Sequence, residues 1–361
     1  MLKKKTVGVV VPCYNEESQI KMVIDNMPDF VDKIIIVNDH SKDNTEQVVR
    51  EIIANCSKTE LPVRKKLKAT IYNRAEQILE KEEKKELVFF TPSKIFNICN
   101  SDRVILINHL ENGGVGAAIA TGYKWCKDSN IDCTAVMAGD GQMDPSELKS
   151  ICLPVLEENI DYVKGNRLIH RSARLVIPKT RFLGNSILSI LTKLASGYWH
   201  VSDTQTGYTA ISLSALKAIP LFKIYKRYGM PNDLLVKLNI AFCTLKEVEI
   251  KPVYNIGEQS KMKIYKVIPT VSWLLIKSFF KRLWHKYLFR DFHPLFLLYH
   301  LSFILIALSI PYGIKIFKAW WTGNNASQLA VLAFMFLVIS GFQSFLFAMW
   351  MDIQDNERLY K

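Results

Sequence analysis

The sequence lacks the cysteine and histidine spacings of a metal site or a disulfide framework. Its seven cysteines include no CxxC pair and no Cys/His ligand spacing. An odd number of cysteines without a pattern predicts reduced thiols in a cytosolic compartment. The N-terminus has no signal sequence, because the apolar run before Pro12 is too short for one, and this run predicts a first β-strand instead. No aromatic-basic module or DNA-reading helix accompanies the formal net charge of +13, so nucleic acid is not an expected partner.

Charge is also missing from a long stretch near the C-terminus. Residues 329–351 contain no charged residue, and residues 295–317 contain a single lysine. Each run has about the length that crosses roughly 30 Å of hydrocarbon. Tryptophans at the edges of these runs are typical of a membrane interface, whereas two buried core helices would not need them. We therefore expect a transmembrane hairpin over residues 294–351.

Basic residues gather just before this hairpin, within residues 266–293. They alternate with apolar residues at helical spacing, which predicts interfacial amphipathic helices on an anionic leaflet. The basic residues are Lys277, Lys281, Arg282, Lys286 and Arg290. By the positive-inside rule, residues 1–294 and the tail 352–361 are expected to be cytoplasmic, so the chain would be a cell-membrane protein with two spans.

The first half of the chain alternates short β-rich runs with helical segments. This alternation predicts βαβ units and a doubly wound, mostly parallel sheet. The expected strands are Val7–Val11, Ile34–Val37, Val104–Asn108 and Thr134–Ala138, and the expected helices are 17–27, 43–55, 116–128 and 145–158. Residues 56–103 interrupt the pattern, and their charged, helix-prone core predicts an exposed insertion, with a partner surface as the alternative.

Polar or glycine-rich turns follow each of the four predicted strands. In an open parallel sheet, ligands bind outside the carboxyl ends of the strands. The last of these turns, GDGQMDP, carries Asp140 and Gln142, whose oxygens suit a hard cation that bridges two phosphates. The turn NGGVG opens a helix and is a candidate anion site. Together these turns predict a nucleotide cleft.

The ordered set VPCYNEES, VNDHSKDNT, NGGVGAA and GDGQMDP resembles the family 2 inverting glycosyltransferases, which have the GT-A fold. The later stretches GNR, SDTQTGY, YGMPNDLLVKL and YNIGEQSKM, followed by the hairpin, resemble the polyprenyl-phosphate glycosyltransferases within that family. This group includes dolichyl-phosphate mannose synthase and bacterial lipid-phosphate glucosyltransferases. The resemblance implies a cytoplasmic GT-A domain over residues 1–265, interrupted by the insertion.

The resemblance also assigns roles to individual residues. Asp140 and Gln142 match the metal ligands, which hold Mg²⁺ or Mn²⁺ on the diphosphate. A second set would surround the nucleotide-sugar: Pro12, Tyr14, Asn15, Glu16, Asp39, Asn112, Gly116 and Gly139. A third set would contact the lipid phosphate: Arg167, Arg181, Ser260 and Lys261. Asp140, Arg167 and Asp233 would be the catalytic residues.

Asp233 matches the acidic residue that acts as general base in many family 2 enzymes. A sugar hydroxyl acceptor requires such a base, whereas a lipid monophosphate is already anionic and needs orientation instead. Asp233 would then position the acceptor or the sugar, and a helix N-cap is the structural alternative.

The resemblance implies a metal-dependent enzyme that moves one sugar from a UDP- or GDP-sugar to a polyprenyl phosphate at the cytoplasmic leaflet. One alternative is transfer to a sugar hydroxyl of a glycolipid or polysaccharide, and another is a catalytically silent nucleotide-binding partner of a membrane assembly. Ala138 and Asn38 stand where the group usually has aspartates, which leaves the donor nucleotide open. The oligomeric state is open as well.

Overall fold

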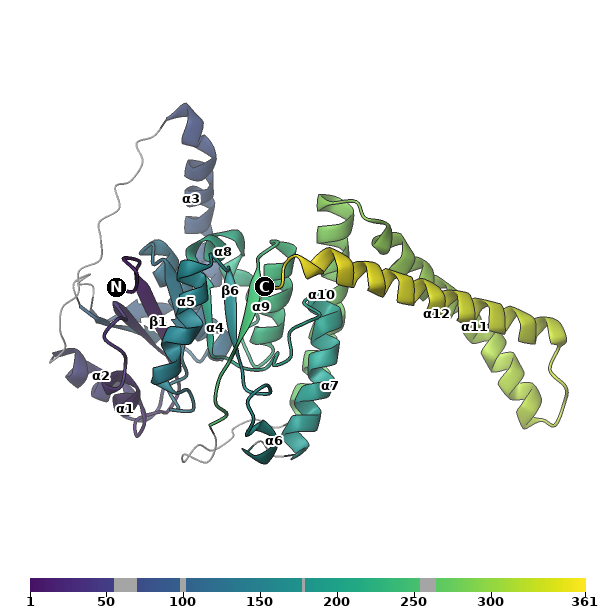
Figure 1. The fold of residues 1–361 in the computed structure, drawn as a ribbon, viewed down its shortest axis with the longest axis horizontal. Helices are drawn as coiled ribbons and strands as arrows, with labels where there is room; N and C mark the ends of the chain where they lie inside the picture. The colour runs from purple at the N-terminus through teal and green to yellow at the C-terminus, as the bar shows by residue number, and fades with distance from the viewer. Residues whose placement is uncertain (55–69, 98–101, 177–178, 254–263) are drawn as a thin grey trace.

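The computed structural model describes residues 1–54, 70–97, 102–176, 179–253 and 264–361. Within helices, the side chains of residues 71, 76, 174, 179–183, 185 and 264–268 are outside this description. The body is built on an eight-stranded sheet with the order β3-β4-β2-β1-β5-β7-β6-β8. An apolar helical hairpin extends from one side of this body (Figure 1).

Four parallel strands form the centre of the sheet and confirm the predicted doubly wound arrangement. They are β1 (Val7–Cys13), β2 (Lys33–Asn38), β4 (Val104–His109) and β5 (Cys133–Val136). Side chains alternate between the faces of a strand. Val10, Ile35 and Ile107 accordingly pack in one core, whereas Val9, Ile36 and Leu106 pack in the core on the opposite face.

The remaining strands extend the sheet at both edges. They are β3 (Ser93–Ile95), β6 (Tyr162–Asn166), β7 (Thr209–Ser212) and β8 (Leu245–Glu249). β7 runs antiparallel to both β5 and β6, and β8 runs parallel to β6. Strands β6 and β8 therefore point the same way as β1, β2, β4 and β5. The carboxyl ends of these six strands and the amino end of β7 meet at one edge of the sheet, which we call the strand-end edge.

Helices cover both faces of the sheet. In chain order they are α1 (Ile20–Asp25), α2 (Thr45–Ala54), α3 (Arg74–Glu86), α4 (Val115–Asp128), α5 (Leu148–Glu157), α6 (Ala173–Val176), α7 (Lys179–Ser196), α8 (Leu213–Ala218) and α9 (Met230–Ile240). Short turns lie at Ile71–Asn73, Leu87–Phe89, Pro145–Glu147 and Leu221–Lys223. The predicted helix start at Asp144 and Pro145 is confirmed, because the Asp144 carboxylate accepts a hydrogen bond from Ser146 N at 2.9 Å.

The predicted insertion is partly exposed and partly built into the sheet. Helix α3 projects from the body (Figure 1), and Tyr72 beside it is 97% exposed. Residues 93–95, however, form the edge strand β3, which pairs antiparallel with β4. The Ser93–Ile95 stretch is short and its side chains are exposed, so it carries no hydrophobic alternation that would reveal a strand.

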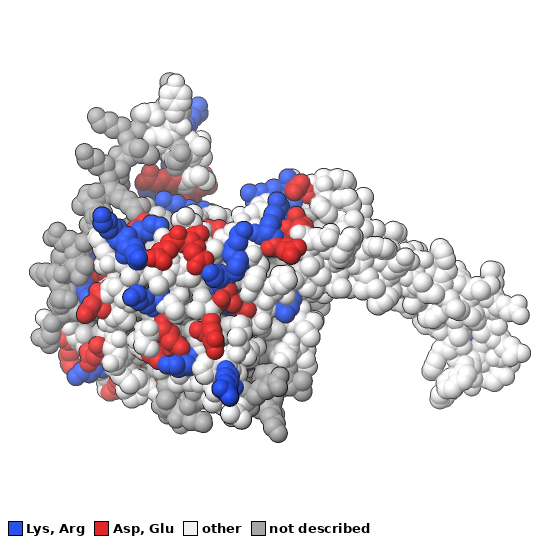
Figure 2. Space-filling view, viewed as in Figure 1, with Lys and Arg blue, Asp and Glu red and all other residues white. Residues whose placement is uncertain are grey.

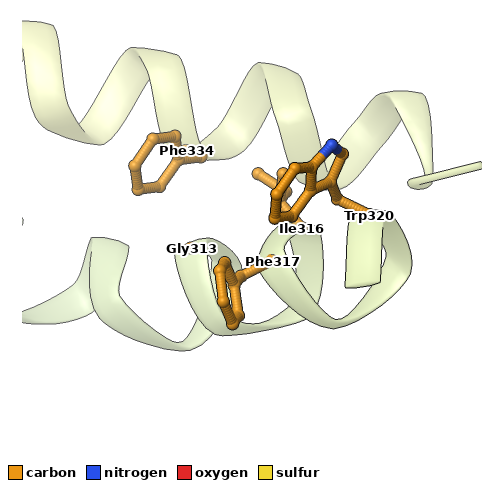
Figure 3. A pocket seen from close by; sticks show the side chains of 5 residues that line it. All are labelled: Gly313, Ile316, Phe317, Trp320 and Phe334. Atoms are coloured by element: carbon orange, nitrogen blue, oxygen red, sulfur yellow. The ribbon is translucent and has the colours of Figure 1, made fainter. Parts of the chain in front are cut away.

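The C-terminal third contains the predicted apolar hairpin. It consists of α11 (Pro294–Trp321) and α12 (Gln328–Glu357), both long and apolar enough to cross a membrane. On the face shown in Figure 2, the hairpin is almost free of charged side chains, in contrast to the body. A groove of 260 Å³ lies between the two helices, lined by Gly313, Ile316, Phe317, Trp320 and Phe334 (Figure 3). This groove is wholly apolar and belongs to the hairpin, not to the strand-end edge.

The segment before the hairpin forms α10 (Ile264–Trp284) and a π-helical turn, His285–Arg290. Lys277, Lys281 and Arg290 are exposed, as expected for an interfacial helix. Arg282 and Lys286 are not: both are fully buried and pair with acidic residues near the end of α12. The expectation of a lipid-facing role is wrong for these two residues, because helical periodicity does not show which face a neighbouring helix covers.

Candidate functional site

The strand-end edge brings together most of the predicted site residues. Asp39 follows β2, Asp140 follows β5, and Arg167 follows β6. The segment 202–208 precedes β7 and so lies at the same edge. Because these segments are far apart in the chain, the sheet topology is what assembles the site.

The first turn at this edge follows β1 and is held by the loop after β2. Asn15 adopts a positive φ of 57°, and its backbone N–H donates to Ser41 Oγ at 3.0 Å. In return, Asn15 Oδ1 accepts from Lys42 N at 2.8 Å, and Glu16 N donates to Thr45 Oγ1 at 3.0 Å. These reciprocal contacts fix the backbone of the predicted nucleotide-binding residues Tyr14, Asn15 and Glu16. Pro12 lies within β1 itself.

Asp39 is buried and its carboxylate caps the glycine turn before α4. Oδ1 accepts from Gly113 N at 2.8 Å and Oδ2 accepts from Gly114 N at 2.7 Å. His109 Nδ1 lies 2.7 Å from Oδ1, and Asn112 Nδ2 donates to the Asp39 carbonyl at 3.2 Å. Burial would raise the pKa of Asp39, but the hydrogen bonds from His109, Gly113 and Gly114 outweigh burial and lower this pKa.

The glycine turn therefore differs from the open anion site expected from the sequence. Its anion is the carboxylate of Asp39, and the amides of Gly116 and Ala117 donate to the Lys226 carbonyl at 2.9 and 3.3 Å. A Cβ on Gly116 would lie 2.0 Å from the Tyr225 carbonyl oxygen. Gly116 is thus a position of close backbone packing, and its contact with the nucleotide-sugar stays a prediction.

The turn after β5 carries the predicted metal ligands. Gly139 N donates to the Pro12 carbonyl at 3.3 Å, and Asp140 Oδ1 accepts from Gln142 N at 3.1 Å. Both Asp140 and Gln142 are partly exposed, and Gly141 has a positive φ of 74° that allows the tight turn. Among the described residues, no cluster of three His, Cys, Asp or Glu side chains surrounds this turn.

This donor set fits a metal ion that takes most of its ligands from its substrate. A carboxylate and a side-chain amide oxygen on one turn are hard oxygen donors of the type that Mg²⁺ prefers. Mg²⁺ is commonly held by one or two carboxylates together with substrate phosphates and water. A closed cage of protein ligands is therefore not required at Asp140.

Arg167 pairs with Asp203, a residue to which the sequence analysis assigned no role. Arg167 Nε donates to Asp203 Oδ2 at 2.8 Å and Nη2 donates to Oδ1 at 3.1 Å, which is a bidentate pair. Asp203 is buried, whereas the Arg167 side chain keeps 22% of its surface exposed. Burial would raise the pKa of Asp203, but the attraction of Arg167 and its hydrogen bonds lower it.

Two further charged residues, the partly buried Glu247 and the buried Lys164, hold the backbone around this pair. Glu247 accepts hydrogen bonds from the amides of Ser202 and Asp203 at 3.0 and 3.1 Å. Lys164 donates to the Thr206 carbonyl, and burial lowers the pKa of this lysine to about 8 in spite of the nearby carboxylates. The segment 202–208 also contacts the metal-ligand turn, because Tyr208 Oη donates to the Asp144 carbonyl at 2.8 Å.

Asp233 lies in the first turn of α9, whose N-cap residue is Gly229. The predicted alternative, an Asp233 N-cap, is therefore wrong. The Asp233 carboxylate accepts from Tyr225 N at 2.8 Å and forms a buried ion pair with Lys237. These contacts hold the segment that packs on Gly116.

For three of the predicted lipid-phosphate-binding residues, the structure describes no side-chain contacts. Ser260 and Lys261 lie outside the described residues, and so does the side chain of Arg181 in α7. His109, Asp203 and Glu247, in contrast, were missed from the sequence. The available signal was weak: His109 ends a buried strand before a glycine turn, and Asp203 stands in the stretch SDTQTGY.

Comparison with known proteins gives consistent matches. A family described as glycosyl transferase family 2 matches residues 8–79 and 91–219. A UDP-N-acetylglucosamine–dolichyl-phosphate N-acetylglucosaminyltransferase of Methanococcus voltae is 32% identical over 257 residues, which cover 70% of this chain and 87% of that protein. A dolichyl-phosphate β-glucosyltransferase of Trichomonas vaginalis is 24% identical, covering 77% of this chain and 74% of that protein.

Solved structures also match. One is glucosyl-3-phosphoglycerate synthase of Mycobacterium tuberculosis, which is 18% identical with a TM-score of 0.47. The match covers 77% of this chain and 81% of that protein. This synthase has been crystallised with UDP and either Mn²⁺ or Mg²⁺.

Proposed function

Because the chain belongs to glycosyl transferase family 2, we propose that it transfers one sugar from a nucleotide-sugar to a polyprenyl phosphate at the cytoplasmic face of a membrane, with inversion. The observation that carries this proposal is an apolar helical hairpin connected to a body that belongs to family 2. A hairpin would keep the body at the bilayer surface, where the phosphate of a lipid acceptor lies. The two relatives named as dolichyl-phosphate transferases support the same acceptor class.

The donor would bind along the strand-end edge. The turn at Tyr14–Glu16, the Asp39-capped turn with Asn112, and Gly139 offer backbone and side-chain polar groups to a nucleotide. UDP-N-acetylglucosamine is the first donor to test, since the Methanococcus voltae relative is named for it. GDP-sugars should be tested as well, because Asn38 and Ala138 stand where the group usually has aspartates, and the identity of the donor nucleotide is therefore open.

Asp140 and Gln142 would hold a divalent cation on the donor diphosphate. When bound, Mg²⁺ or Mn²⁺ neutralises negative charge that develops on the departing nucleoside diphosphate. Arg167, already oriented by Asp203, would contact a phosphate through its partly exposed side chain. Arg181, Ser260 and Lys261 complete the proposed set of lipid-phosphate contacts.

The acceptor phosphate would attack without a general base. A monoester phosphate has a second pKa of about 6 and is largely dianionic at neutral pH. The Asp233 carboxylate is engaged with Lys237 and Tyr225, which favours a positioning role for this residue. A sugar hydroxyl acceptor would instead need Asp233 to take a proton.

The arrangement of the hairpin supports the proposed topology. Arg282, before α11, donates to the Ala195 carbonyl of α7, and Asn356, near the end of α12, accepts from Asn239 of α9, so the hairpin enters and leaves on the body's side. A body on the cytoplasmic side would thus place the C-terminus there as well. A C-terminal tag should be reached by protease only from the cytoplasmic side.

The proposal is tested by following release of nucleoside diphosphate from detergent-purified protein. The assay supplies polyprenyl phosphate, Mg²⁺ or Mn²⁺, and a panel of UDP- and GDP-sugars. We expect release that requires both lipid and metal and that disappears in Asp140→Ala. Release that responds to a glycolipid or sugar instead would assign the activity to hydroxyl transfer, and silence without nucleotide binding would favour a non-catalytic partner.

A further inference from the structure

The C-terminal end of the chain returns to the body after the membrane hairpin and is fixed there. Leu245 N in β8 donates to the Leu359 carbonyl at 2.7 Å, and Lys361 N donates to the Leu245 carbonyl at 2.9 Å. The tail 352–361, which is predicted to be cytoplasmic, is partly helix and partly paired with the sheet edge. Figure 1 shows the C-terminus lying against the body beside β6 and α9.

A buried ion pair fastens this end of α12. Arg282 of α10 makes a bidentate pair with Asp352, with both N–O distances at 2.7 Å and both side chains fully buried. Two parallel hydrogen bonds fix orientation as well as distance. Burying charge is costly, so any movement that separated the two side chains would leave an uncompensated buried charge. The pair therefore favours a single geometry.

Further polar contacts surround this pair. Tyr287 Oη donates to Asp352 Oδ1 at 2.9 Å, and Lys286 Nζ lies 3.2 Å from Asp355 and 2.6 Å from Asn356 Oδ1. We call Arg282, Lys286, Tyr287, Asp352, Asp355 and Asn356 the hairpin junction. Its cations come from before the hairpin and its carboxylates from the last turns of α12, so both ends of the hairpin are held together.

Arg282 of the junction and the nearby Arg290 also donate hydrogen bonds to the C-terminal ends of two body helices. Arg282 Nε and Nη2 donate to the carbonyls of Ala195 and Leu194, the last turn of α7, each at 3.0 Å. Arg290 Nη1 donates to the Ile240 carbonyl at the end of α9 at 2.8 Å. Cations at helix C-termini satisfy free carbonyls and the helix dipole. The orientation of α7 and α9 is thus tied to that of the hairpin.

Helix α7 connects the junction to the segment that holds Arg167. Ser189 Oγ donates to the Ser202 carbonyl at 2.9 Å and lies 3.1 Å from Thr204 Oγ1. Between Ser202 and Thr204 stands Asp203, whose carboxylate orients Arg167. A second link runs from Thr192 through Asn232 to Gln205, with distances of 3.1 and 2.9 Å. The Arg282–Asp352 ion pair, helix α7 and the side-chain hydrogen bonds of Ser189 therefore connect the hairpin to the segment that holds Arg167.

We propose that Arg282 and Asp352 are positioning residues for an acceptor held in the membrane. Through α7 and the segment 202–208, this pair fixes the position of Arg167 relative to the bilayer. This inference rests on the proposed function, since it concerns where the acceptor phosphate meets the site. A rigid junction matters only when the acceptor is itself held in the bilayer. A short, water-soluble acceptor can diffuse to the site whatever the hairpin's angle.

The test compares two acceptors in full-length protein reconstituted in vesicles. One is a long-chain polyprenyl phosphate in the bilayer and the other is a short-chain prenyl phosphate in solution. For Asp352→Asn we expect kcat/KM to fall at least tenfold with the bilayer acceptor and to stay within twofold with the soluble one. Arg282→Lys keeps the charge without the two parallel N–H bonds and should show the same selectivity in a milder form. Arg358→Gln, which removes an exposed partner of Asp355, is the matched control and should change neither.

Amide hydrogen exchange gives a second readout that needs no acceptor. In Asp352→Asn, exchange should rise in α7 and in residues 202–208, while the central strands β1 and β2 stay protected. Equal losses with both acceptors, or unchanged exchange at 202–208, would overturn the inference. A wild-type protein that uses neither acceptor would refute the proposed function, and exchange would still decide the coupling.

Discussion

His109 and Asp39 form a buried pair that supports the glycine turn at the strand-end edge. His109 Nδ1 lies 2.7 Å from Asp39 Oδ1, and His109 Nε2 lies 2.9 Å from Thr121 Oγ1 in α4. Each of these two residues is 3% exposed. The imidazole therefore connects the end of β2 to the helix that the glycine turn opens, and the carboxylate that it orients caps that turn.

Replacing His109 should weaken donor binding more than it slows the chemical step. His109→Ala removes a charge-assisted hydrogen bond worth about 1.5–3 kcal/mol, so we expect the KM for the nucleotide-sugar to rise by about ten- to a hundredfold. His109→Asn, which can still donate to Asp39, should recover part of the loss. Steady-state kinetics with His285→Gln, an exposed histidine, as the control would check this. A fall in kcat at unchanged KM would contradict a role in holding the donor site.

Asp39 should contribute stability that depends on pH in a defined direction. Its pKa is lowered from 3.8 in the folded protein, so its stabilisation is complete above pH 3.8 and is lost as the pH falls through the folded value. Asp39→Asn should therefore lower the free energy of unfolding by about 2 kcal/mol at pH 7. Denaturant unfolding in detergent should show this difference shrinking below pH 4. A pH-independent difference would mean that the charge of Asp39 is not what stabilises the turn.

Because Arg167 pairs with Asp203 through two hydrogen bonds, we expect that a positive charge at position 167 is not sufficient for activity. Lysine cannot make the bidentate pair with Asp203, so Arg167→Lys should lower kcat/KM about a hundredfold. Asp203→Asn should act in the same direction, because it releases the guanidinium. The exposed Arg171→Lys serves as the matched control and should be nearly silent. Near-normal turnover in Arg167→Lys would remove Arg167 from the phosphate site.

Asp233 offers a test between a base and a positioning residue. If the acceptor is a phosphate, Asp233→Asn should lower kcat without shifting the pH dependence of kcat/KM, because the variant still accepts from Tyr225 N. Loss of the acidic limb of the pH profile in this variant would instead identify Asp233 as the general base.

Two glycines predict opposite outcomes for the same substitution. Gly116→Ala would place a Cβ 2.0 Å from the Tyr225 carbonyl, so we expect it to destabilise the protein by about 1–3 kcal/mol. Gly184→Ala, in α7, would place a Cβ with no neighbour within 4 Å among the atoms that the structure describes, the helix's own backbone aside, and should stabilise the protein by up to about 1 kcal/mol. Thermal unfolding of the two variants side by side would measure this. A tolerated Gly116→Ala would show that the segment at Tyr225 does not pack on this turn.

Much of the architecture followed from patterns within single segments. Apolar runs of the right length predicted the central strands and the hairpin, because burial and membrane insertion both depend on local hydrophobicity. Polar residues at strand ends predicted the edge where the site lies. Local patterns could not predict the close packing of Gly116, because it depends on Tyr225, more than a hundred residues away.

The partners of charged residues were beyond the reach of the sequence. The pairs Arg167–Asp203 and Arg282–Asp352 join segments that only the folded chain brings together. A basic residue on an amphipathic helix has the same local pattern whether it faces lipid or a buried carboxylate. The pairing of residues in the hairpin junction could therefore not be predicted from the sequence.

The most direct test of the account is the fate of the acceptor phosphorus. Polyprenyl phosphate, metal and nucleotide-sugar are incubated with the purified enzyme, and the lipid is followed by ³¹P NMR. We expect conversion of the phosphate monoester to a glycosyl phosphodiester in equal amount to the nucleoside diphosphate released, and none with Asp140→Ala. Nucleoside diphosphate release with the lipid phosphorus still a monoester would contradict it.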